Sequence, residues 1–349
     1  MQFSAILIDW YRKQHRRLPW RETQDAYKIW LSEIILQQTR VDQGLPYYLK
    51  FVETYPTIEE LANAPIDDIL KLWQGLGYYS RTRNLHKAAQ QVLSEHSGKF
   101  PSDYKELLKL SGIGPYTAAA IASFAFHLPY AVVDGNVYRV LSRYFGVELP
   151  IDRPLGQKYF AELATEVLDD DRPHLHNQAI MEFGAVQCTP KNPDCAQCPL
   201  NESCMAVELN SVSDLPRKEG KTKVKEIWMN YLFIEMGDKV AIRKRDDRGI
   251  WRGLYDFPVL ESERSTSRHE AQNHPDWKKI LNNGAVEVHS VTDGIKHRLS
   301  HRLLNIRFWH LITDTMPQFP GIVMVDREEL PTFAVPIVIH QWMEDRGLA

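Results

Sequence analysis

The residue of this sequence with the clearest catalytic potential is Glu33, which lies in the mostly apolar stretch 26–52. Helical spacing places Ile29, Trp30 and Leu36 beside it. A carboxyl group among apolar neighbours loses hydration, so its pKa rises, as a general acid working near neutral pH requires. Taken alone, the stretch favours the plainer alternative, a partly exposed glutamate paired with an arginine.

A second chemical feature is the clustering of all four cysteines between residues 188 and 204, with the spacing C-x6-C-x2-C-x5-C. Four thiolates in so short a loop can bind one [4Fe–4S] cluster or one tetrahedral zinc ion, or form two local disulfides. Their clustering favours a metal, but spacing alone does not separate the cluster from zinc. The candidate ligands are Cys188, Cys195, Cys198 and Cys204.

A turn with two glycines, residues 111–115 (SGIGP), separates a helix that ends near Leu110 from an Ala-rich helix over 116–126. Gly112 and Gly114 allow positive φ and leave the amides of the next helix uncovered, which suits a phosphate. An ordinary helix–turn–helix corner would show the same G-x-G pattern, so the motif alone is weak.

The elements that must position these residues fall into two regions. A helix followed by a turn is expected over 3–22, and short helices separated by Pro and Gly continue to about residue 206. A polar linker is expected over 207–225. From residue 226 the pattern alternates, which predicts strands at 227–235, 239–245, 286–291, 303–312 and 321–326 and a closing helix at 335–344.

Composition narrows the class of protein. A formal net charge of −3 gives no overall basic character, so nucleic-acid binding would need a local patch, such as the arginines and lysines over 12–21. No apolar run approaches the length of a membrane span, and the first residues lack a signal-peptide cleavage pattern.

Several motifs, in a fixed order, carry a resemblance to a known family. The segments LPWR (18–21), SEIILQQTRV (32–41), GLGYYSR (75–81), LSGIGPYTA (110–118) and VVDGN (132–136) precede the cysteine loop. Together they resemble the endonuclease III superfamily of helix–hairpin–helix DNA glycosylases, and within it the adenine DNA glycosylases of the MutY type. The resemblance covers nearly the whole chain.

The resemblance implies a catalytic set. Glu33 would be the catalytic acid, and Asp134 would stabilise or covalently trap the cationic sugar; the sequence does not choose between these two roles. Tyr116 and Asn136 complete the set. Bifunctional members carry a lysine nucleophile where this chain has Tyr116, and a tyrosine cannot form a Schiff base.

The resemblance also implies binding residues. Tyr78 would intercalate, while 18–21 lies beside the adenine pocket, and Gln178 and Glu182 are candidates for polar contacts to the flipped base. The implied substrate- and DNA-binding set is Trp20, Arg21, Leu36, Gln37, Gln38, Thr39, Tyr78, Gly112, Gly114, Gln178, Glu182, Ser300 and His301. The cysteine spacing matches the superfamily's loop, which decides for a [4Fe–4S] cluster.

The C-terminal region resembles a Nudix-type fold, beginning at residues 241–258. The glutamate cluster of the Nudix metal box is absent from 261–284, so nucleotide hydrolysis is not expected. Ser300 and His301 match the hairpin that reads 8-oxoguanine, but Leu299 replaces the usual Phe, which puts stacking by that residue in doubt. The plainer alternative is that both are exposed strand-end residues.

We therefore expect an all-α helix–hairpin–helix glycosylase domain with an iron–sulfur loop (1–206), a linker (207–225) and an α+β Nudix-like domain (226–349). The expected protein is a monofunctional base-excision-repair enzyme. It would remove adenine opposite 8-oxoguanine or guanine in duplex DNA, as a monomer in the bacterial cytoplasm. The alternatives are a bifunctional glycosylase/lyase, a non-catalytic iron–sulfur DNA-binding sensor and, more weakly, a zinc-containing Nudix hydrolase.

Overall fold

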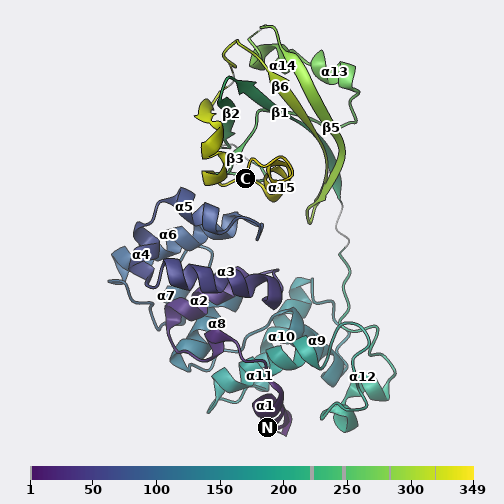
Figure 1. Ribbon diagram of the computed structural model, residues 1–349. Helices are drawn as coiled ribbons and strands as arrows, with labels where there is room; N and C mark the ends of the chain where they lie inside the picture. Colours follow the sequence, from purple (N-terminus) through teal and green to yellow (C-terminus); the bar gives the residue numbers. More distant parts are fainter. Residues whose placement is uncertain (1, 221–223, 246–248, 283, 319) are drawn as a thin grey trace. The chain divides into compact units, whose positions relative to one another are not determined.

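The computed structural model describes residues 2–220, 224–245, 249–282, 284–318 and 320–349 (Figure 1). Residues 221–223 of the expected linker and 246–248 of the Nudix-like segment lie outside the described residues. The chain forms two compact units, one of residues 1–63 and 84–221, the other of residues 64–83 and 222–349. The sequence did not indicate that 64–83 packs with the C-terminal region; the boundaries at 206 and 226 stay a prediction.

The first unit is helical. Its elements are α1 (Gln2–Gln14), η1 (Pro19–Arg21), α2 (Ala26–Leu36), α3 (Val41–Thr54), α4 (Ile58–Asn63), the greater part of α6 (Ser80–Glu95), α7 (Tyr104–Leu107), α8 (Pro115–Phe126), α9 (Gly135–Phe145), α10 (Pro154–Glu166), α11 (Pro173–Val186), η2 (Asn201–Ser203) and α12 (Met205–Glu208). The expected helix–turn–helix is thus α7, the glycine turn and α8, followed by α9.

Local sequence explains where several of these helices begin. Asp25 and Asp134 are N-caps whose carboxylates accept from the backbone amides of the first turns of α2 and α9. Pro115, Pro154 and Pro173 occupy first-turn positions of α8, α10 and α11, where the missing N–H costs nothing.

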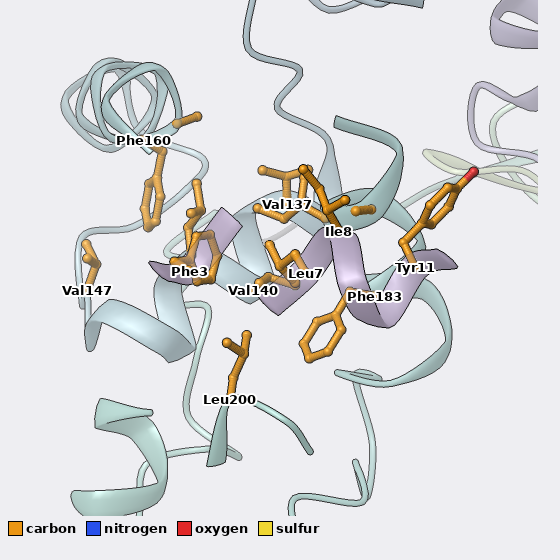
Figure 2. Packing of buried hydrophobic residues seen from close by; sticks show 14 of the residues in the cluster. Phe3, Leu7, Ile8, Tyr11, Val137, Val140, Val147, Phe160, Phe183 and Leu200 are labelled. Atoms are coloured by element: carbon orange, nitrogen blue, oxygen red, sulfur yellow. The ribbon is translucent and has the colours of Figure 1, made fainter. Parts of the chain in front are cut away.

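One apolar core packs the first helix of the helical unit, α1, against the later helices α9 and α11. Figure 2 shows Phe3, Leu7 and Ile8 of α1 lying against Val140 of α9 and Phe183 of α11, and these side chains belong to one buried cluster. Because α11 packs against both α1 and α9, its residues Gln178 and Glu182 lie near Asp134, which directly precedes α9. The apolar core therefore fixes the positions of these polar residues.

The second unit is built on a seven-stranded mixed sheet with the strand order β3-β2-β1-β6-β5, to which β4 adds by pairing with β1 and β7 by pairing with β2. Its elements are α5 (Ile66–Leu72), β1 (Lys225–Met236), β2 (Lys239–Lys244), β3 (Tyr255–Asp256), β4 (Val259–Ser262), α13 (Arg268–Gln272), α14 (Pro275–Ile280), β5 (Glu287–Arg298), β6 (Arg302–Ile312), β7 (Ile322–Asp326), η3 (Arg327–Thr332) and α15 (Ile337–Glu344).

The two long central strands, β1 and β6, run parallel from the pair Lys225–Arg302 to the pair Glu235–Ile312. Alternate side chains of the sheet face opposite sides. Trp309 of β6 packs with Trp277 of α14, at 4.9 Å between ring centroids, whereas its neighbour Phe308 stacks on Trp342 of α15 at 4.7 Å. Helices therefore cover both faces of the sheet (Figure 1).

The predicted fold class is confirmed: a helical core is followed by an α+β unit, with strands at 225–236, 239–244, 302–312 and 322–326 and a final helix at 337–344. The structure adds β3, β4, α13 and α14, which are short and carry little periodicity. Within the described residues, no helix is both long enough and apolar enough to span a membrane.

Candidate active site

Glu33 lies in the middle of α2 and is only 8% exposed. The Tyr116 hydroxyl, from α8, donates a hydrogen bond to Glu33 Oε2 at 2.7 Å. Burial raises the pKa of Glu33 to about 7, in part offset by the Tyr116 hydrogen bond and the charge of Arg21, while the negative charge of Asp134 adds to the increase. Glu33 can therefore hold a proton at neutral pH and give it up to a base.

Asp134 caps the N-terminus of α9. Its Oδ1 accepts from the backbone amides of Asn136 and Val137 at 2.8 Å, and its Oδ2 accepts from Asn136 Nδ2 at 2.8 Å. Burial raises the pKa of Asp134, whereas these three hydrogen bonds and the charge of Arg139 act in the opposite direction. Burial and hydrogen bonding therefore act on the pKa of Asp134 in opposite directions.

One pocket of the first unit brings the four expected catalytic residues together, namely Glu33, Tyr116, Asp134 and Asn136. Six of the expected binding residues also line it: Trp20, Arg21, Leu36, Thr39, Gln178 and Glu182. Its remaining wall is largely apolar, with contributions from Leu18, Ile29, Val41, Phe124 and Met181. A mostly apolar cavity with a few convergent polar groups is the usual form of a small-molecule or base-binding site.

Glu182 has strong partners that the sequence did not reveal. Its carboxylate is fully buried and is bonded by Arg16 Nη2 and Arg21 Nη2, each at 2.7 Å to Oε2, while Arg16 Nε binds Oε1 at 2.7 Å. Burial alone would raise the pKa of Glu182, but the arginine hydrogen bonds outweigh it and bring the pKa to about 2. Its main contacts are therefore two arginines, and a contact to a base stays a prediction.

Other polar contacts hold the walls of the pocket in place. Tyr11 donates from its hydroxyl to Gln178 Oε1 at 2.6 Å, which orients the amide of Gln178. Arg139 donates to Asn136 Oδ1 at 2.8 Å and to the backbone oxygen of Cys188 at 2.7 Å. Sequence reasoning missed Tyr11, Arg16 and Arg139, each of which has at least one partner far away in the chain.

The segment after α2 and the turn before α8 contain the other expected DNA-contacting residues of this unit. Gln37 donates from Nε2 to Thr117 Oγ1 at 3.3 Å. Gln38 has a positive φ of 54°, a conformation that the turn between α2 and α3 requires. Gly112 has a φ of 75°, and a Cβ there would lie 2.7 Å from the Cβ of Asn84, so only glycine fits. Gly114 is the N-cap of α8.

The four cysteines are free thiols in the structure and line one cavity together with Arg143. Burial, with contributions from the neighbouring cysteines, raises the pKa of Cys198 to about 11. Burial also raises the pKa of Cys195, and a bound iron–sulfur cluster would supply the positive charge that favours the thiolate form of such cysteines. Arg143 Nη1 also lies 3.4 Å from Cys188 Sγ, as a hydrogen bond to a cluster ligand would need.

The remaining expected residues lie in the second unit. Tyr78, Ser300 and His301 line one pocket with Leu299 and Trp251. The hydroxyls of Tyr78 and Ser300 are hydrogen-bonded to each other. Tyr78 has a positive φ of 49° and the residue is 45% exposed, so the turn leaves it accessible from solvent. Tyr78, which is expected to intercalate, and the hairpin with Ser300 and His301, which is expected to read 8-oxoguanine, therefore line the same pocket.

Three family models match the chain. Residues 31–163 match the HhH-GPD superfamily of base excision DNA repair proteins, residues 188–204 match the iron–sulfur binding domain of endonuclease III, and residues 230–345 match the NUDIX domain. The middle match coincides with the four cysteines, so the expected [4Fe–4S] cofactor is confirmed.

Curated relatives of this chain are named adenine DNA glycosylase. An adenine DNA glycosylase of Buchnera aphidicola (subsp. Baizongia pistaciae) is 35% identical over 319 residues, which cover 89% of this chain and 86% of the relative. The Homo sapiens adenine DNA glycosylase is 41% identical over 396 residues, covering 95% and 72%.

The solved structure of a thermostable thymine-DNA glycosylase is 31% identical, with a TM-score of 0.56, and covers 60% of this chain and 96% of that one. A non-covalent endonuclease III–DNA complex, 20% identical with a TM-score of 0.52, covers 60% and 95% and supports the fold alone. The expected enzyme class is confirmed: on the pocket, the cysteine loop and these relatives, the chain belongs to the adenine DNA glycosylase family.

Proposed function

We propose that the protein removes adenine mispaired with 8-oxoguanine or guanine from duplex DNA, and that it does so without cleaving the strand. The observation that carries this proposal is Glu33, a buried acid with a pKa of about 7, in the same pocket as the carboxylate of Asp134. The relatives named adenine DNA glycosylase support the choice of base.

The first step is protonation of the flipped base. Duplex DNA hides the reacting atoms of adenine, so the nucleotide must leave the stack to enter the pocket. Glu33 then donates its proton to N7, which turns adenine into a leaving group. Because Tyr116 donates to Oε2, the transferred proton is carried by Oε1. Trp20, Gln178 and Glu182 with its arginines form the surrounding walls.

Loss of the base leaves positive charge at C1′, as in glycoside hydrolysis. Asp134 would meet that charge, and the hydrogen bonds from Asn136 and Val137 hold its carboxylate in a fixed orientation. A cation beside Asp134 also favours its ionised form. The carboxylate either stabilises the cation or bonds to it until water attacks; both routes leave an abasic site.

The second unit would read the base opposite the adenine. Ser300 and His301 offer hydrogen-bonding groups beside Tyr78, which would enter the stack as a wedge. Gln37, Gln38 and Thr39 would contact the same region of the duplex, and the turn with Gly112 and Gly114 would hold a phosphate.

The cysteines would hold the [4Fe–4S] cluster, which supplies a rigid cross-link within the loop that follows α11. Arg143 contributes a hydrogen bond to one of the sulfur ligands. We further propose that the enzyme acts as a monomer associated with DNA in the bacterial cytoplasm.

The test is a labelled duplex with one adenine opposite 8-oxoguanine, with adenine opposite thymine as the control, analysed with and without hot alkali. Strand breaks only after alkali, and only in the mispair, are expected. Breaks without alkali would establish a lyase instead, and tight binding without base release would establish a sensor. The double variant Ser300→Ala, His301→Ala is expected to lose the preference for 8-oxoguanine over guanine; an unchanged preference would remove the reading role of the second unit.

A further inference from the structure

Residues 64–83 belong to the second compact unit, although the sequence on both sides of them belongs to the first. This segment contains α5, the turn that presents Tyr78 and the beginning of α6. Glu33 and Asp134 lie in the first unit. The proposed wedge and the proposed catalytic pair are therefore carried by different units.

The first anchor of the segment is an ion pair. Lys244 Nζ, at the end of β2, lies 2.7 and 2.8 Å from the two carboxylate oxygens of Asp67 in α5. Tyr255 of β3 donates from its hydroxyl to Asp67 Oδ2 at 3.4 Å. Lys244 and Tyr255 are paired in the β2–β3 register, so Asp67 is held at one point of the sheet.

The second anchor is at the end of α5 and uses backbone groups. The backbone amide of Val335 donates to Gln74 Oε1 at 3.1 Å. Lys71 Nζ donates to the backbone oxygen of Phe333 at 3.2 Å. Because η3 and α15 flank these two backbone groups, the contacts fix α5 against the segment that connects them.

The third anchor follows Tyr78 in the chain. Arg83 donates from Nη1 to the backbone oxygen of Arg252 at 2.6 Å, and the Tyr78 hydroxyl is hydrogen-bonded to Ser300. The turn itself is stiffened by Trp73, whose Nε1 donates to the oxygen of Gly77 at 3.0 Å. Tyr78 is thus held on both sides by groups of the C-terminal region.

We propose that Asp67 and Gln74 are positioning residues for Tyr78. Asp67 fastens the segment 64–83 to the sheet and Gln74 fastens it to the connector between η3 and α15, so that Tyr78 and the hairpin with Ser300 and His301 meet DNA as one body. Neither residue would touch the reacting adenine. The anchoring stands on the contacts alone, whereas its consequence for selectivity rests on the proposed function.

Hydrogen exchange in the full-length protein without DNA tests the anchoring. Asp67→Lys and Lys244→Asp are each expected to raise exchange of the amides over 66–79 by about fivefold, and the double variant Asp67→Lys, Lys244→Asp is expected to restore the wild-type rate. Asp68→Lys is the matched control, because it makes the same charge change at an exposed neighbour in α5. Wild-type exchange in both single variants, or no recovery in the double variant, would overturn the proposal.

Selectivity is the second measurement. The ratio of adenine release opposite 8-oxoguanine to release opposite guanine should fall about fivefold in each single variant and recover in the double variant. The pH profile of adenine release, which reports on Glu33, should stay unchanged. Faster exchange with a wild-type ratio would overturn the positioning role. A wild-type enzyme without any preference would defeat the proposed function instead, while the exchange data would still decide on the anchors.

Discussion

The Tyr116 hydroxyl donates a 2.7 Å hydrogen bond to one carboxylate oxygen of the buried Glu33. This bond favours the ionised carboxylate, whereas burial favours the protonated acid, and the pKa of about 7 is the outcome of the two. Tyr116 thus limits how far burial can raise the pKa, which keeps Glu33 able both to hold and to release a proton.

Glu33→Gln should bind the mispaired duplex but release adenine at least about 10³-fold more slowly, because the amide has no proton to give. The same change should stabilise the fold above pH 7 by roughly 3 kcal/mol, since wild type must ionise a buried group whose pKa is raised from 4.5 to about 7. That gain should vanish below pH 4.5, where Glu33 is protonated in both states. Single-turnover assays and urea unfolding from pH 4 to pH 8 measure the two effects; near-normal turnover would remove Glu33 from the mechanism.

Tyr116→Phe should raise the pKa of Glu33 above about 7, because it removes a hydrogen bond that lowers it. The rate of adenine release falls as Glu33 loses its proton, so the basic limb of the pH profile should move to higher pH. Tyr27→Phe is the control, since Tyr27 is also a buried tyrosine, but it donates to the backbone oxygen of Tyr55. A basic limb that stays in place would show that another group sets it.

Asp134→Asn should abolish adenine release, by about 10³-fold or more, because the neutral amide cannot meet the charge at C1′. Asparagine is also a good N-cap, so the fold should lose no more than about 1 kcal/mol. Asp103→Asn makes the same exchange at the N-cap of α7, outside the pocket, and should leave the rate unaltered. Retained activity in Asp134→Asn would contradict the assigned role.

Glu182→Gln should cost roughly 3 kcal/mol of stability at neutral pH, because Arg16 and Arg21 lose a buried anionic partner. The folded pKa of Glu182 is lowered from 4.5 to about 2, so its contribution is fully present above pH 4.5 and is lost as the pH falls towards 2. The difference between wild type and variant in urea unfolding should shrink over that window. Glu219→Gln breaks an exposed pair with Arg153 and should cost less than about 1 kcal/mol; equal costs would contradict the buried-pair account.

Local patterns were sufficient to predict the elements around the site. Gly112 and Gly114 marked the turn before α8, and alternating apolar residues marked β1 and β6. The apolar neighbours of Glu33 indicated a raised pKa before any partner was known. These features depend on residues within a few positions of one another, which a single sequence displays directly.

Long-range pairing could not be predicted in the same way. Arg16 and Glu182 are 166 positions apart, and no local pattern indicates that they meet. Likewise, the parallel pairing of β1 with β6 and the attachment of Asp67 to Lys244 depend on tertiary packing. The burial of Asp134, which raises its pKa, is also a property of the folded chain and not of its neighbours in sequence.

The assignment of residues 64–83 to the second unit has a consequence for biosynthesis. Residues 1–63 and 84–221 can make their mutual contacts while the rest of the chain is still being synthesised. Asp67 and Gln74 meet Lys244 and Val335 only after the ribosome has added those distant residues. We therefore expect α5 of a nascent or prematurely terminated chain to lack these partners and to be more open to a chaperone or a protease than in the complete chain.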